Sequence, residues 1–167
     1  DNSGSAKPLN NGKGTTFEGG MRVMTIFKGP NIQTGIVEDI GSQLDFFTTI
    51  LTLAEIESPF NPEDSYDLSQ TLRYKKSSPR QTIPYFVGSE LRAFRYKNHK
   101  IHFVTQGAYN LPPKRVEHEI PLLFNLEADI GEEEALSNLN LIEEVNRQAD
   151  LFKDGLKIRN SILDIQY

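Results

Sequence analysis

Residues 10–23 of the chain are Asn10-Asn11-Gly12-Lys13-Gly14-Thr15-Thr16-Phe17-Glu18-Gly19-Gly20-Met21-Arg22-Val23. The glycines on either side of Lys13 allow the backbone to approach a ligand closely and to adopt positive φ. A lysine in such a loop is a compact cation on a flexible stem, which suits a small anion. The apolar run from Met21 to Phe27 predicts a strand directly after the loop. The stretch therefore predicts a loop that presents one cation at the edge of a sheet.

A second interpretation of this loop is a simple turn with a solvated lysine, because short Gly-Lys-Gly matches arise by chance. A phosphate-binding P-loop is excluded, since that motif needs Ser or Thr directly after the lysine and this chain has Gly14 there. Taken alone, the loop leaves the turn and the anion site open.

The composition limits the classes of function. The chain has 167 residues and a net charge of −5, so it offers no basic stripe and we expect no nucleic-acid partner. No apolar run is long enough for a membrane span. The sequence contains no cysteine, which excludes a cysteine nucleophile and a thiolate metal site within these residues. Because the sequence begins at Asp1 without a methionine, we expect an upstream part to be missing.

The segment from Gly12 to Val23 closely resembles the Gly-Lys-Gly-Thr-Thr-(Trp/Tyr)-Glu-Gly-Gly-x-Arg segment of the formylglycine-dependent sulfatases, the arylsulfatase family of the alkaline phosphatase superfamily. In that family the lysine contacts the substrate's sulfate, and the resemblance gives this role to Lys13. The family also carries an Asp-Asn pair a short loop earlier, which ligates a divalent cation, usually calcium. The resemblance assigns this role to Asp1 and Asn2, whose carboxylate and amide oxygens are hard donors. Ser3 stands where the family has glycine.

Further segments resemble the same family in the same order, among them Glu90–Phe103 and Pro121–Glu127. The resemblance covers most of the chain and corresponds to the last third or so of a sulfatase. It implies an α/β fold in two parts. Residues 1–75 would be the closing part of an alkaline-phosphatase-like catalytic domain. Residues 76–167 would be a C-terminal antiparallel sheet packed with a long helix.

The N-terminal half contains one clear helix signal. Ser42 can cap a helix with Asp45 as its capping-box partner. A wide apolar stripe follows from Leu44 to Ala54, which predicts burial against a sheet. The segment Ser77–Arg80 superficially resembles the Cys/Ser-x-Pro-x-Arg nucleophile motif, but its proline and arginine are adjacent, so we interpret residues 74–80 as a linker.

The residues after this linker have the two-residue period of strands. Apolar runs at 83–87 and 90–96 flank Gly88-Ser89, a pair suited to a type II′ hairpin turn. Lys97-Asn98 turns the chain again into a strand at 100–105, which predicts a meander with one covered and one wetter face. His99 and His102 fall on opposite faces of that strand, which disfavours a shared metal ion and favours a structural or solvated role for each.

The last predicted elements are a strand at 121–127 and a long helix. Residues 107–119 have the composition of a loop. Apolar residues recur in steps of three and four from Leu136 to Phe152, which predicts an amphipathic helix packed on the sheet. Gly155 is a suitable stop, and the acidic run 132–134 before the helix would interact favourably with its dipole.

The resemblance implies a sulfuric ester hydrolase. The family's nucleophile is a formylglycine made from Cys or Ser, expected upstream of this chain together with catalytic histidines, so these residues alone are expected to be inactive. The implied partners are a sulfated small molecule or glycan and the missing N-terminal part of the same enzyme. The implied compartment is extracytoplasmic: secreted, periplasmic or lysosomal.

Two alternatives from other classes remain open at this point. One is a phosphodiesterase or phosphonate hydrolase of the alkaline phosphatase superfamily. The other is a non-catalytic binding or structural module in which Lys13 and Asp1 are merely solvated.

Overall fold

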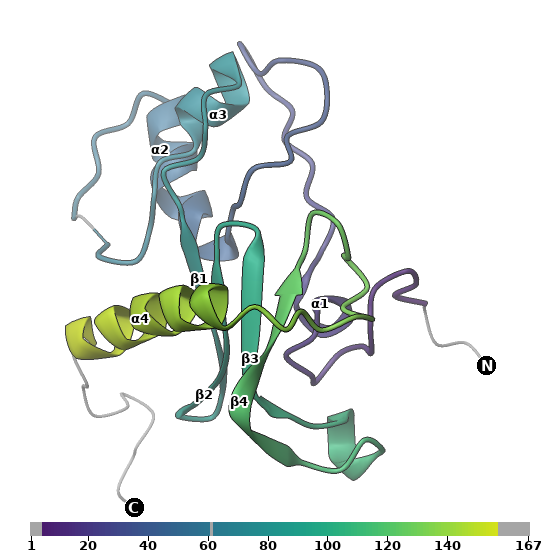
Figure 1. Cartoon of the computed structure of the whole chain (residues 1–167). Helices are drawn as coiled ribbons and strands as arrows, with labels where there is room; N and C mark the ends of the chain where they lie inside the picture. The colour runs from purple at the N-terminus through teal and green to yellow at the C-terminus, as the bar shows by residue number, and fades with distance from the viewer. Residues whose placement is uncertain (1–4, 61, 157–167) are drawn as a thin grey trace, which may run out of the picture.

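The computed structural model describes residues 5–60 and 62–156. Its elements in chain order are α1 (Glu18–Met21), η1 (Gln43–Asp45), α2 (Phe46–Leu53), α3 (Ser69–Tyr74), β1 (Thr82–Val87), β2 (Glu90–Tyr96), β3 (His99–Thr105), η2 (Ala108–Asn110), β4 (Val116–Asn125) and α4 (Leu139–Gly155). An antiparallel sheet in the order β1-β2-β3-β4 lies at the centre, with α4 packed across it (Figure 1). The predicted α/β fold with a C-terminal antiparallel sheet and a long helix is confirmed.

The predicted hairpins are present. Val87 pairs with Glu90 across a two-residue turn, and Gly88 has φ +60°, as the first central position of a type II′ turn requires. β2 and β3 join through the second predicted turn, with Tyr96 opposite His99. Local turn chemistry thus fixes the register of three strands.

β4 departs from the prediction because it begins at Val116, inside the segment predicted as a loop. The wetter face predicted for the meander is also wrong at β3, where Lys100, Ile101 and His102 are all buried. α4 contacts β3, and Phe17 from the N-terminal segment stacks on His102 with ring centroids 4.7 Å apart. Both faces are covered because two chain segments distant in sequence pack on the same strand.

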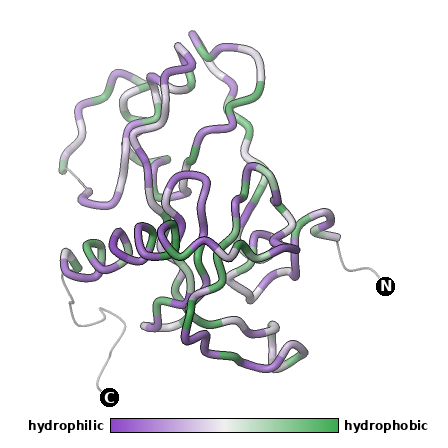
Figure 2. The backbone as a smooth tube through the Cα atoms, in the orientation of Figure 1, coloured by the Kyte–Doolittle hydropathy of each residue, from purple (hydrophilic) through white to green (hydrophobic). Residues whose placement is uncertain are grey.

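The core forms where α4 meets the sheet. Its fully or nearly fully buried members are Phe94, Ile101, Leu123, Ile142, Val145 and Ala149. Figure 2 shows hydrophilic and hydrophobic residues alternating around the turns of α4, as expected for an amphipathic helix. Burial of one such aliphatic side chain contributes about 1.5–3 kcal/mol. The helix ends at Gly155, the predicted stop, but it begins after the cap Asn138, so Leu136 of the predicted apolar period lies outside it and bridges to Leu123 instead.

The strand predicted from Met21 to Phe27 is wrong in this structure. α1 occupies Glu18–Met21, and the extended residues after it pair with no strand in the described ranges. The exposed fractions of Val23, Met24 and Ile26 are 78%, 93% and 86%. A strand needs a neighbour for its backbone hydrogen bonds, so the apolar run remains extended and uncovered.

The predicted helix start at Ser42 is confirmed, with both capping-box bonds to Asp45 present. The burial predicted for the stripe that follows is wrong. Within α2 only Thr49 is buried and Ile50 is more than half exposed, as is Leu44 in the preceding η1. α2 instead packs on α3, beyond one end of the sheet (Figure 1).

The segment predicted as a linker at 74–80 ends in a buried ion pair. The Arg80 guanidinium donates from Nη2 to Asp45 Oδ1 at 2.6 Å and from Nε to Asp45 Oδ2 at 2.7 Å. The same carboxylate accepts from the backbone N–H of Ser42 and of Tyr66. Through Arg80, Asp45 therefore connects the segment just before β1 to the start of α2. Across the ranges that the model describes, no helix has the length and apolar character needed to cross a bilayer.

Candidate functional site

The loop that carries Lys13 is closed on itself by short-range hydrogen bonds. The Thr15 N–H and its side-chain hydroxyl both donate to the carbonyl of Gly12, at 3.2 and 2.9 Å. The Gly19 N–H donates to the carbonyl of Asn10 at 3.0 Å. Residues 10–19 therefore form a compact loop with Lys13 at its exposed tip.

Two glycines of this loop are required by geometry. Gly14 has φ +92°, and a Cβ there would lie 3.1 Å from the Ala108 Cβ and 3.6 Å from the Tyr109 ring. At Gly19 a Cβ would lie 2.3 Å from the carbonyl oxygen of Asn10, which no side chain tolerates. The expectation that glycines shape the main chain here is therefore met, and the segment around Tyr109 flanks the lysine loop.

Lys13 itself is exposed and forms no ion pair with any residue in the ranges described. Asp1 and Asn2, the predicted metal ligands, lie outside those ranges, so their proximity to Lys13 stays a prediction. Among the described residues no group of three His, Cys, Asp or Glu side chains is placed to hold a metal ion. The two hard oxygen donors at Asp1 and Asn2 fit calcium by their chemistry.

Beneath the loop lies a buried charge cluster that the sequence did not indicate, formed by Glu18, Lys100, His102 and Glu132. All four side chains are buried, with residue exposures of 0–3%. The Lys100 ammonium bridges the two carboxylates, 2.9 Å from Glu18 Oε1 and 3.0 Å from Glu132 Oε1. Buried charges require such pairing, because an isolated one carries a large desolvation cost.

Glu132 contacts the lysine loop at both of its ends. Its Oε2 accepts from the backbone N–H of Glu18 at 2.6 Å, and its own carbonyl accepts from the Asn10 side-chain amide at 3.2 Å. Its Oε1 accepts from His102 Nε2 at 2.7 Å. The interpretation of Glu132 as a helix-dipole partner is therefore incorrect, since its carboxylate is turned inward.

The protonation of His102 follows from its partners. Burial lowers the pKa of His102 below its ordinary value, even though the bond to Glu132 opposes this. A neutral imidazole has one donor and one acceptor nitrogen. Nε2 faces a carboxylate and so carries the proton, which leaves Nδ1 to accept from the Thr16 hydroxyl at 3.4 Å. His102 has the structural role that the sequence favoured.

Arg22 and Tyr85 are the remaining neighbours of Glu18 and Lys100. Burial raises the pKa of Glu18, but the Lys100 ammonium and the Arg22 guanidinium together outweigh this effect and hold the pKa below its ordinary value. Arg22 adds a partly exposed cation 2.9 Å from Glu18 Oε2. Burial, followed by the Glu18 charge, raises the pKa of Tyr85 far above its ordinary value, and its ring lies 4.3 Å from the Lys100 ammonium.

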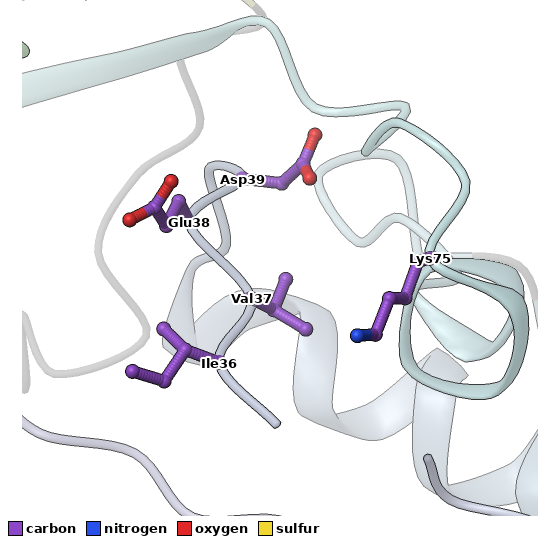
Figure 3. A pocket seen from close by; sticks show the side chains of 5 residues that line it. All are labelled: Ile36, Val37, Glu38, Asp39 and Lys75. Atoms are coloured by element: carbon purple, nitrogen blue, oxygen red, sulfur yellow. The ribbon is translucent and has the colours of Figure 1, made fainter. Parts of the chain in front are cut away.

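The described surface contains two pockets, one distant in sequence from the lysine loop and one beside it. One, of about 330 Å³, is lined by Ile36, Val37, Glu38, Asp39 and Lys75 (Figure 3). Figure 3 shows the Lys75 ammonium reaching toward Val37 while the Glu38 carboxylate is directed elsewhere, so its charged groups do not converge. The other, of about 630 Å³, lies where residues 7–11 meet Gly131 and Glu133, next to the lysine loop.

The comparison with known families gives a clear result. Residues 78–165 match the family described as the C-terminal region of aryl-sulfatase. The chain belongs to this family and is a C-terminal sulfatase portion.

Relatives agree with this assignment. Arylsulfatase A of Bos taurus is 36% identical over 154 residues, covering 83% of this chain and 29% of that protein. Arylsulfatase A of Homo sapiens is 35% identical over 147 residues, 78% of this chain and 28% of that protein. N-acetylgalactosamine-6-sulfatase of Sus scrofa is 36% identical over 156 residues, 80% of this chain and 30% of that protein. The chain thus spans about three tenths of the length of these relatives.

Solved structures share the fold. The PsFucS1 sulfatase of Pseudoalteromonas sp. superposes with a TM-score of 0.74 at 24% identity, covering 88% of this chain and 32% of that one. A Bacteroides thetaiotaomicron protein described with glycosaminoglycan metabolism superposes with a TM-score of 0.67 at 21% identity, covering 87% and 32%. At these identities the likeness shows the fold alone.

Proposed function

We propose that this chain forms part of a sulfuric ester hydrolase in which Lys13 binds the sulfate group of the substrate. The observation that carries the proposal is the lysine loop itself. It is a hydrogen-bonded, glycine-shaped turn that presents an exposed ammonium with no ion-pair partner in the described ranges, in a chain of the sulfatase family. An ammonium held in this way can donate to oxygens that gain negative charge as the S–O bond breaks.

Asp1 and Asn2 would hold a divalent cation, calcium by the chemistry of their oxygens. When bound, the cation would offset charge on the sulfate oxygens, and a formylglycine supplied from outside these residues would provide the nucleophile. This chain's own contribution is to orient the sulfate through Lys13. The 167 residues alone are expected to show no turnover.

The remainder of the sulfatase is the proposed partner. Large apolar side chains lie exposed along residues 23–26, on η1 and on α2, including Val23, Met24, Ile26, Leu44 and Ile50. Exposed apolar surface of this extent is typical of an interface. The family assignment suggests that the catalytic part of the same enzyme covers it. We further propose a sulfated small molecule or glycan as substrate, which the names of the relatives support. The resemblance to the sulfatase family is the basis for proposing an extracytoplasmic location as well.

The test is replacement of Lys13 by alanine in the complete enzyme. Loss of one preorganised charge donor costs about 100-fold or more in turnover, so Lys13→Ala should lower sulfate-ester hydrolysis by that factor. Lys28→Ala removes an exposed lysine beyond α1 and is the matched control, expected to match wild type. Unchanged hydrolysis by Lys13→Ala, or faster cleavage of a phosphodiester than of a sulfate ester by wild type, would refute the proposal.

A further inference from the structure

We infer that the buried charge cluster of Glu18, Lys100, His102 and Glu132 positions the lysine loop from the C-terminal sheet, with Glu132 as the central positioning residue. The structure contains the contacts between the cluster and the loop. The effect of these contacts on catalysis rests on the function proposed above. No member of the cluster can touch substrate directly, because all four are buried.

The members of the cluster come from three distant parts of the chain. Lys100 and His102 lie on β3, inside the sheet, on the face opposite Ile101, which packs in the core with α4. Glu132 lies in the segment between β4 and α4, and Glu18 lies near the end of the lysine loop, where α1 begins. The cluster thus joins the loop to the central sheet. The loop and the sheet are separated by more than 80 residues in sequence, as the Lys100–Glu18 pair shows.

Glu132 binds both ends of the loop. Through its side chain it binds the N–H of Glu18, and through its carbonyl it binds the Asn10 amide. Glu132 adopts φ +51°, a conformation uncommon outside glycine. This backbone geometry accompanies an inward carboxylate and a carbonyl directed at Asn10. Lys13 lies between the two attachment points, so their separation sets where the loop tip can be.

A chain of hydrogen bonds also connects the cluster to Thr16 within the loop. The Thr16 hydroxyl donates to His102, and His102 donates to Glu132. Phe17 stacks on the same imidazole. Three consecutive loop residues, Thr16 to Glu18, therefore contact the cluster directly. A loop fixed at this many points keeps Lys13 in one place without any contact to the ammonium itself.

The first experiment measures amide hydrogen exchange in Glu132→Gln. Glutamine keeps the shape, but its amide nitrogen cannot accept one of the bonds that the carboxylate accepts from Lys100, His102 and Glu18. Bonds to charged groups are among the stronger ones. Exchange of the amides of residues 12–19 should therefore accelerate about 10-fold or more, while β2 and β3 stay protected. Glu134→Gln, an exposed acid of the same segment, is the control.

Thr16→Val provides a milder second variant that removes only the bond from Thr16 to His102. It should accelerate exchange in the same residues to a smaller degree. The inference is overturned if the loop amides keep their wild-type exchange rates in Glu132→Gln, or if exchange rises equally throughout the sheet.

The second experiment is a double-mutant cycle on sulfate-ester hydrolysis by the complete enzyme. If Glu132 acts through Lys13, Glu132→Gln lowers kcat/KM in wild type but has little further effect in Lys13→Ala. A purely structural role would give equal fold losses in both backgrounds and would overturn the inference. A neutral Lys13→Ala would instead refute the proposed function, and the exchange result would still decide whether Glu132 holds the loop.

Discussion

Gly14 shows how closely the lysine loop depends on single atoms. Its φ of +92° lies in a region that L side chains rarely adopt, and its neighbours leave little room for a Cβ. Gly12, on the other side of Lys13, has open space around the position of a Cβ. The two glycines that flank the lysine therefore have different physical requirements.

This difference gives a prediction for stability. Gly14→Ala should lower the free energy of unfolding by about 1–2 kcal/mol from the left-handed backbone alone, with the 3.1 Å contact to Ala108 adding to it. Gly12→Ala should leave the stability nearly unchanged, because alanine there meets no atom. Urea unfolding followed by circular dichroism measures both variants. Equal losses for the two would show that the loop is not held in the described conformation.

At the scale of elements, the Asp45–Arg80 pair joins the α2 region to the sheet. Asp45 is fully buried and Arg80 nearly so. Their bidentate geometry is the strong form of this interaction. The pair also explains why residues 78–80 are ordered against the body of the molecule, where the sequence suggested only a linker.

Asp45→Asn should therefore destabilise the chain strongly. The amide nitrogen of asparagine would face two donors, Arg80 Nε and the Ser42 N–H, and would leave the guanidinium charge uncompensated. Breaking a buried ion pair on one side costs about 3–5 kcal/mol. Thermal unfolding should show a large drop in Tm, whereas Glu144→Gln, at an exposed pair with Arg147, should barely alter it. A Tm of Asp45→Asn close to wild type would contradict this account.

The elements predicted correctly are those determined by local sequence. The Gly88-Ser89 turn, the capping box at Ser42 and the apolar period of α4 each act within a few residues. The strand expected at 21–27 failed because a strand depends on neighbours, and none of the described strands pairs with it.

The lysine loop could be predicted because its glycines and Lys13 are contiguous in sequence. The buried charge cluster could not. Its pairs join residues 30 to 114 positions apart, and the burial of Lys100 depends on two segments packing on β3. The one available signal was the spacing of Lys100 and His102, which places both on the same face of a strand.

At the scale of the whole molecule, the N-terminal part presents the lysine loop, and the C-terminal sheet with Glu132 holds that loop in place. The sheet and α4 form a complete core, whereas residues 23–26 and α2 leave apolar side chains uncovered. A sulfatase assembled from this chain and its proposed catalytic part would thus place Lys13 on a support built by the C-terminal sheet.

The most direct test of the central claim is a crystal structure of the complete enzyme with a non-hydrolysable sulfate-ester analogue. The account predicts the Lys13 ammonium within about 3 Å of a sulfate oxygen, as expected for a charge-assisted hydrogen bond, with Glu132 still bound to the Glu18 N–H. A structure in which the sulfate is bound by other residues while the Lys13 ammonium faces solvent would contradict it.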